Sequence, residues 1–143
     1  MFNLCREWHH VMIKRDAGEK SCKVRHGKNV IKFVNGSLFI GTGKNINSCN
    51  KEISSLWKSK YVYCENSHLV IHYSKNGVLK SNTPIEGVIE LSITEKNPEV
   101  LEGTFRDIAP ANDQGLMYFY KRSRDADLKL KELLDDKTDN KII

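Results

Sequence analysis

Short runs in which apolar and polar residues alternate recur along most of the chain, and this pattern constrains the fold more than any other feature. The clearest case is NVIKFVNGSLFIG (Asn29–Gly41), where two alternating runs flank Asn35-Gly36. A period of two is typical of half-buried strands. Asn-Gly is the dipeptide that best tolerates the positive φ angles of a type I′ turn. The segment therefore predicts a β-hairpin.

The same alternation predicts further strands. In Trp8–Lys14, alternate residues starting at Trp8 share one face and those starting at His9 share the other. The other candidates are Cys22–Arg25, Lys60–Cys64, His68–Tyr73, Gly87–Thr94, Leu101–Arg106 and Leu116–Arg122. Turn signals separate them at Ser74–Gly77, Lys96–Pro98 and Ala109–Asp113. About nine strands can be counted, and eight is the number that fits most comfortably.

Consecutive short strands with local connections predict an antiparallel meander, which can remove its edges by closing into a barrel. At about eight strands the interior is filled by side chains or holds one small ligand. Asp125–Asp136 has helical spacing with Asp125 as its N-cap, although Leu128–Lys131 also fits a strand that continues from Arg122. We expect an all-β fold: a compact antiparallel meander closing into a roughly eight-stranded barrel with one short C-terminal helix. Residues 1–136 would form a single domain, and residues 137–143 a flexible tail.

The composition is that of a soluble protein. The chain has 143 residues, 39% of them hydrophobic and 29% charged, which is enough to bury one core. No apolar run approaches the ~20 residues that span a bilayer and no signal peptide opens the chain, so a cytoplasmic location is expected. Four cysteines (Cys5, Cys22, Cys49 and Cys64) are scattered without a CxxC pair, which favours reduced thiols over a disulfide.

The charge is unevenly distributed along the chain. The net charge is +5, but from Asp125 onward there are four lysines and six acids. Residues 1–124 therefore carry +7. A basic body with an acidic tail favours an anionic partner such as a nucleotide, a nucleic acid or a membrane surface.

Local motifs give little support for catalysis or metal binding. GTGKN (Gly41–Asn45) is rich in glycine, but it lacks the Walker spacing and the Ser/Thr that binds magnesium, so a loop is expected there. His68 and His72 share a strand face and His9-His10 is a second cluster, whereas zinc needs three or four converging ligands. No GxSxG, HExxH, DFG or paired-carboxylate pattern occurs. We expect neither an enzyme nor a resident metal or cofactor.

The remaining signal is an alternation of aromatic and cationic side chains. Tyr118, Tyr120 and Arg122 share one face of their strand, and Thr104 and Arg106 share one face of the preceding strand. Tyrosine and tryptophan can stack on nucleobases, and arginine can pair with phosphate. The alternative is that these aromatic residues only fill or coat the barrel, because aromatic residues favour strands. The sequence leaves open which face points inward.

Five motifs between about Trp57 and Arg122 occur in a recognisable order. Trp57 precedes the aromatic strand YVYC (Tyr61–Cys64), LVIHY follows, a glycine opens EGVIELSI, and LEGTF and the glycine-led GLMYFYKR complete the series. In this order they resemble the β-barrel receptor domain of bacterial CBASS anti-phage effectors, in which a few transmembrane helices precede a β-rich domain. No such helices occur in this sequence, so the resemblance implies a soluble domain or a stand-alone relative.

The resemblance implies a non-catalytic sensor domain that binds a cyclic dinucleotide in anti-phage (CBASS) signalling. It also implies self-association, and a membrane anchor in a longer form that would lie at the cytoplasmic face of the inner membrane. Arg106 or Arg122 would pair with phosphate, and either tyrosines 118 and 120 or Trp57 and Tyr61 would stack on bases. The residues expected to bind the ligand are Trp57, Tyr61, Thr104, Arg106, Tyr118, Tyr120 and Arg122.

Two rivals remain. A lipocalin-like carrier of an apolar molecule predicts an interior of Met117, Phe119, Phe105 and Ile89 without a cation. A single-stranded nucleic-acid-binding barrel, which would use its outer surface, predicts affinity that falls steeply with salt. If Met117 and Phe119 point inward, Tyr118 and Tyr120 lie outside and Lys121 replaces Arg122 as the inner cation.

Overall fold

The protein is a closed, eight-stranded antiparallel β-barrel with one C-terminal helix. The computed structural model describes residues 3–15, 23–77, 84–109 and 113–142. The elements are β1 (Glu7–Lys14), β2 (Val24–Val34), β3 (Ser37–Ile40), β4 (Gly43–Asn47), β5 (Ile53–Glu65), β6 (His68–Gly77), β7 (Ile85–Ser92), β8 (Val100–Ala109), β9 (Gln114–Tyr120) and α1 (Ser123–Ile142). The all-β barrel expected from the alternation is thereby confirmed.

Closure of the sheet is achieved by the first strand. β1 pairs with β9 along His9–Lys14 and with β2 along Glu7–Ile13, both antiparallel. The strands from β4 to β9 follow one another as a meander. β3 is a ninth strand that pairs only with the end of β2, so it extends the wall of the barrel without entering the ring.

The Asn-Gly hairpin forms as expected. Asn35 and Gly36 have φ angles of 49° and 82°, the positive values that a type I′ turn requires. β2 is longer than predicted, because the short strand expected at Cys22–Arg25 and the first arm of the hairpin form one strand that begins at Val24. A second turn with two positive φ angles, at Asn66 and Ser67, joins β5 to β6.

The interior of the barrel is a single apolar core. Trp8 and Met12, which the alternation placed on one face of β1, and Phe119 of β9 are among its members. Each buried large side chain contributes roughly 1.5–3 kcal/mol to folding. The core includes Leu4, Trp8, Met12, Ile31, Ile40, Trp57, Val62, Leu69, Ile71, Tyr73, Ile89, Leu91, Ile93, Leu101, Phe105, Met117 and Phe119.

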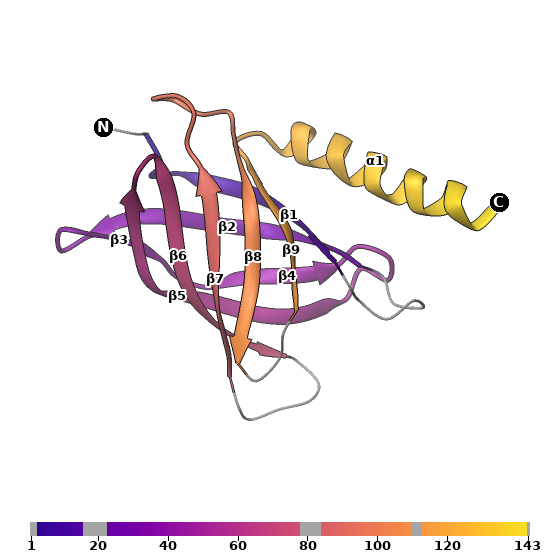
Figure 1. Ribbon diagram of the computed structural model, residues 1–143, viewed down its shortest axis with the longest axis horizontal. Coiled ribbons are helices and arrows are strands. Elements are labelled where there is room, and N and C mark those ends of the chain that lie inside the picture. The colour runs from indigo at the N-terminus through magenta and orange to yellow at the C-terminus, as the bar shows by residue number, and fades with distance from the viewer. Residues whose placement is uncertain (1–2, 16–22, 78–83, 110–112, 143) are drawn as a thin grey trace.

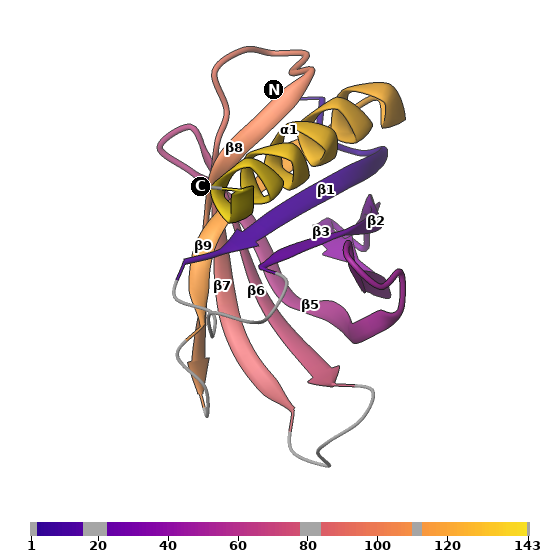
Figure 2. The same cartoon turned by 90° about the vertical axis from the view of Figure 1, so that its right-hand side faces the viewer.

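Helix α1 covers part of the outer surface of the barrel. Figure 2 shows it lying along the outer side of β1. Ala126 of the helix is buried against Val11 and Val24, and Leu130, Leu133 and Leu134 pack on the same cluster. This burial decides the question left open by the L-K-L-K pattern in favour of a helix. The helix begins at Ser123, so Asp125 lies in its first turn and is not the N-cap.

Two local predictions were wrong. Ser74–Gly77 belongs to β6 and is not a turn, because Lys75 faces inward and is paired there. Gly43–Asn45 belongs to β4 and is not a loop, because Gly43 lets the backbone lie against the indole of Trp57, where any Cβ would collide. Helix α1 extends through residues 137–142, within the segment expected as a C-terminal tail.

The cysteines also differ from expectation. Cys5 and Cys64 are free and exposed, but Cys49 is in a disulfide bond. The fourth cysteine, Cys22, lies outside the described residues. Within the described ranges, no helix has the length and apolar character needed to cross a membrane.

Candidate binding site

The centre of the barrel is occupied by side chains. The cavity there, lined by Met12, Trp57, Tyr73, Ile89 and Phe105 among others, has a volume of about 10 Å³. This is close to the minimum needed for one water molecule. A fatty acid or a cyclic dinucleotide is far larger, so neither fits in this cavity as it stands.

Two clusters of polar side chains are buried within the otherwise apolar interior. The first is a chain of hydrogen bonds centred on His10: Nδ2 of Asn29 lies 3.2 Å from His10 Nδ1, and Nε2 of His10 lies 2.9 Å from Oδ1 of Asn45. Asn45 in turn donates to Ser55 Oγ at 2.9 Å. Burial lowers the pKa of His10 to about 4, because desolvation disfavours the imidazolium. The ring is therefore neutral at pH 7 and can accept at one nitrogen while donating at the other.

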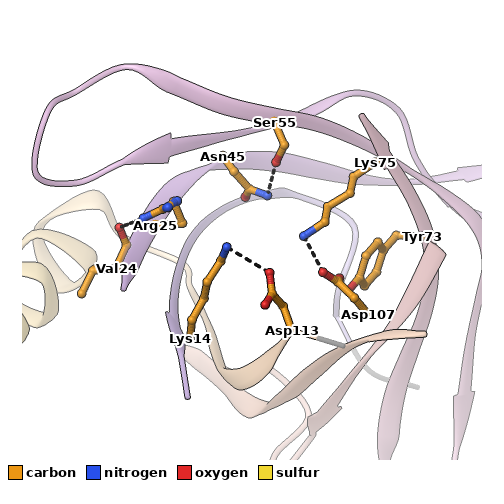
Figure 3. A network of polar contacts seen from close by, with 9 residues as sticks. All are labelled: Lys14, Val24, Arg25, Asn45, Ser55, Tyr73, Lys75, Asp107 and Asp113. Atoms are coloured by element: carbon orange, nitrogen blue, oxygen red, sulfur yellow. Dashed lines mark hydrogen bonds and ion pairs between the residues drawn. The ribbon is translucent and has the colours of Figure 1, made fainter. Parts of the chain in front are cut away.

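The second polar cluster contains a buried ion pair. Lys75 Nζ lies 2.9 Å from Oδ2 of Asp107, and the hydroxyl of Tyr73 donates to the other carboxylate oxygen. Figure 3 shows the lysine and the tyrosine converging on Asp107 from β6. Oδ2 has no hydrogen bond of good geometry, so the contact with Lys75 is chiefly ionic. The interior expected for the carrier, Met117, Phe119, Phe105 and Ile89, is present, but it is not free of cations.

The predicted ligand-binding residues of β5 lie on opposite sides of the wall. Trp57 is only 4% exposed and lies inside, with its ring 5.6 Å from that of His10. Tyr61 is 65% exposed on the outside, beyond a break in the pairing register, and contacts His72 edge-on. The two aromatic rings cannot stack on one base.

The predicted residues of β8 point outward. Phe105 and Asp107 face the interior, so Thr104 and Arg106 face solvent on the alternate side. Both line a shallow hollow that also contains the carboxylate of Glu90. Arg15 lines the same hollow, so its lining carries two arginines and one glutamate.

The predicted residues of β9 also lie outside the barrel. Met117 and Phe119 are buried in the interior, whereas Tyr118 and Tyr120 stack on each other beneath α1 with ring centroids 6.1 Å apart. Lys129 of the helix lies 4.7 Å from the centroid of Tyr118. Partial burial raises the pKa of Tyr120 to about 12.

The cations that follow β9 do not project into the barrel. Arg122 Nε lies 3.5 Å from Glu99, and Lys121 Nζ lies 3.8 Å from the same carboxylate. Lys121 is therefore not the inner cation expected for this orientation of β9. The seven predicted residues thus occupy the core, the outer wall and the helix interface, and the structure does not bring them together into one pocket.

A different part of the surface forms a larger pocket. It has a volume of about 620 Å³ and lies beside the start of α1, over the part of β2 between its pairing with β4, which ends at His26, and its pairing with β3, which begins at Ile31. Gly27 lets β2 lie close to β4 beside the pocket, because a Cβ there would collide with the carbonyl of Lys44 and contact the ring of His10. The lining residues are His9, His10, His26, Gly27, Lys28, Asn29, Val30, Lys32, Phe39, Gly41, Thr42, Lys44, Ile46, Ser123, Ala126, Asp127 and Leu130.

The pocket is positively charged with apolar walls. Lys28, Lys32 and Lys44 contribute three positive charges and Asp127 one negative charge. In the part of the chain that the structure describes, no ion pair joins any of these three lysines to a carboxylate. Partial burial lowers the pKa of His26, although Asp127 opposes this shift. Phe39, 43% exposed, offers an aromatic surface at the rim.

Sequence reasoning missed this pocket, but a signal was present. From Lys20 to Lys51 the sequence contains seven lysines and arginines and no acidic residue. The excess positive charge of the protein is therefore concentrated in this one segment. The glycine-rich GTGKN motif also belongs to the pocket, since Gly41, Thr42 and Lys44 line it.

Among the residues with described positions, no group of three or more His, Cys, Asp or Glu side chains could hold a metal ion. Comparisons of the chain with protein-family models, curated proteins and solved structures found no match.

Proposed function

We propose that this protein is a non-catalytic ligand-sensing barrel that binds a small nucleotide in the basic pocket between β2, the β3–β4 segment and α1. A cyclic dinucleotide, the class implied by the resemblance to CBASS receptor domains, is the proposed ligand. The observation that carries the proposal is a pocket of about 620 Å³ whose lining has three lysines against one aspartate. Ligand pockets of about 300–1,000 Å³ accommodate molecules of this size.

The roles of the pocket side chains follow from their chemistry. A cyclic dinucleotide carries two phosphates and two flat bases. Lys28, Lys32 and Lys44 supply ammonium groups for the phosphates. Phe39 offers a face for stacking, a contact that is worth roughly 1–3 kcal/mol per base. Thr42 can donate a hydrogen bond from the β3–β4 connection.

This placement replaces the interior site expected from the sequence. Because the central cavity holds about 10 Å³, an interior site would require the core to be expelled. The small volume of the central cavity also argues against a lipocalin-like carrier, which would hold its apolar ligand there. The outer-surface nucleic-acid reader stays as the rival, since a basic pocket attracts any phosphate chain.

Calorimetry tests the proposal. Cyclic di-AMP, cyclic di-GMP, AMP, palmitate and a single-stranded oligonucleotide would be titrated into the protein. The expected result is micromolar or tighter binding of one cyclic dinucleotide, weakened at least tenfold by Lys28→Ala with Lys44→Ala. The matched control removes two exposed lysines outside the pocket, with Lys58→Ala and Lys131→Ala.

The Arg106→Ala variant distinguishes binding in the basic pocket from binding at the outer face of β8. Binding that is lost in this variant but kept in the double lysine variant would move the site to the outer face of β8 and overturn the pocket. Binding of the oligonucleotide alone would favour the nucleic-acid reader. The absence of binding to every cyclic dinucleotide would refute the proposed ligand class.

A further inference from the structure

The β2–β3 hairpin exposes large apolar side chains around its turn. Phe33 is 66% exposed, Val34 45% and Phe39 43%, and all three lie within four residues of Asn35-Gly36. Figure 1 shows the turn of this hairpin projecting beyond the wall of the barrel. Clustered apolar exposure of this kind marks an interaction surface more often than scattered single residues do.

The exposed side chains lie on both faces of the hairpin. Phe39 pairs with Lys32 and points to the outer side, whereas Phe33 pairs with Leu38, which packs against the core. A flat partner that rests on one face would therefore leave one phenylalanine uncovered. Immersion of the whole tip in an apolar medium covers both.

Cations lie along the same hairpin. Lys28 and Lys32 are exposed on β2, and Lys44 is exposed at the start of β4. The segment from Lys20 to Lys51 contains no acidic residue that would repel an anionic surface. Lysines at the base of an apolar tip match the layering of a bilayer, with anionic headgroups outside and acyl chains within.

We infer that the tip of the β2–β3 hairpin inserts into the surface of an anionic lipid bilayer. Phe33 and Val34 enter the acyl boundary while Lys28 and Lys32 contact the headgroups. A nucleic acid is the less favoured partner, because phenylalanines on opposite faces cannot form one stacking platform. The inference goes beyond the proposed ligand, and Phe33 and Val34 do not line the pocket.

Vesicle sedimentation tests the inference. The protein would be mixed with vesicles of phosphatidylcholine alone and with vesicles that also contain phosphatidylglycerol. We expect binding to the anionic vesicles that weakens with added salt, as screening reduces the attraction of the lysines. Phe33→Ser with Val34→Ser should weaken it by about tenfold or more, because two buried apolar side chains are lost.

Leu128→Ser is the matched control. Leu128 is also 66% exposed, but it lies on α1, so its removal should leave vesicle binding unchanged. The thermal unfolding midpoint of each variant shows whether the barrel is intact. Equal binding by the hairpin variant and the wild type would overturn the inference, as would binding only to an oligonucleotide.

Insertion can also be observed directly. Trp8 and Trp57 are buried at 0% and 4% exposure, so they contribute a constant fluorescence background. A new indole from Phe33→Trp should shift its emission to shorter wavelength on anionic vesicles and be quenched by brominated lipid. An unshifted spectrum under conditions in which the protein sediments with vesicles would show that the tip stays in water. This measurement is independent of nucleotide binding, so either proposal can fail alone.

Discussion

The imidazole of His10 and the amide of Asn45 link β1 to β4, the two strands that flank β2 in the barrel, with Nε2 of the histidine 2.9 Å from Oδ1 of the asparagine. Because Asn45 Oδ1 accepts, the histidine must carry its proton on Nε2. Its Nδ1 then accepts from Asn29. This arrangement uses neutral histidine, and it lies directly behind the basic pocket that both residues 10 and 29 help to line.

The first prediction is a loss of stability at acid pH. The pKa of His10 is lowered from 6.5 to about 4 by burial, so between these values the unfolded chain binds more protons than the folded one. Burial of neutral His10 therefore makes a pH-dependent contribution to the free energy of unfolding of on the order of 3 kcal/mol. This contribution is fully present above pH 6.5 and is lost as the pH falls toward 4. Urea unfolding measured across this range should show the slope, and His10→Gln should flatten it. An unchanged slope in that variant would mean that His10 is not the group responsible. A residual slope is expected from His26, whose pKa is also lowered by burial.

The second prediction concerns Gly27. A Cβ at this position would collide with the carbonyl of Lys44, so Gly27→Ala should force β2 and β4 apart and destabilise the fold by about 1–3 kcal/mol. Gly41→Ala is the control, because the nearest atom to a Cβ there is in the ring of Phe39, at 3.8 Å. Thermal unfolding distinguishes the two variants, and equal midpoints would contradict a tight seam at Gly27.

The third prediction concerns the buried ion pair. Asp107→Leu leaves the ammonium of Lys75 unpaired in the interior, so it should cost roughly 3–5 kcal/mol of unfolding free energy. Lys75→Met with Asp107→Leu removes both charges and should recover much of that loss. Tyr73→Phe removes only a donor to Asp107 and should cost about 1–3 kcal/mol.

Urea unfolding of the wild type, of Asp107→Leu, of Lys75→Met and of the variant with both substitutions completes a thermodynamic cycle. Additive effects of the two charge substitutions would show that Lys75 and Asp107 are not coupled, contrary to their 2.9 Å separation.

The fold could be predicted because its main cause is local. Period-two alternation showed which residues of β1 share a face, and Asn35-Gly36 fixed the register of the hairpin. The failures arose where a distant residue decided the outcome. Ser74–Gly77 has the composition of a turn. It is nevertheless part of a strand, because the ammonium group of Lys75 forms an ion pair with Asp107 of β8 inside the barrel.

The candidate site was harder to predict because the outer face of β9 is itself apolar. Tyr118 and Tyr120 alternate with Met117 and Phe119, so either face could have been the inner one. The choice depends on α1, which covers the two tyrosines from outside. The acid-free segment from Lys20 to Lys51, by contrast, can be read directly from the sequence. Its significance depends on the close approach of β2 to β4 at Gly27, which no local pattern shows.

The last prediction concerns thiol chemistry. Cys49 is in a disulfide bond, whereas Cys5 and Cys64 are free and exposed. Treating the native protein with iodoacetamide without a reductant should therefore modify Cys5 and Cys64 and leave Cys49 unmodified. Partial burial raises the pKa of Cys64, and because the thiolate is the reactive form, this thiol should need a higher pH to react. Peptide mass spectrometry before and after reduction measures all three sites. Labelling of Cys49 without reductant would show that its thiol is free, as the scattered cysteines of the sequence first suggested.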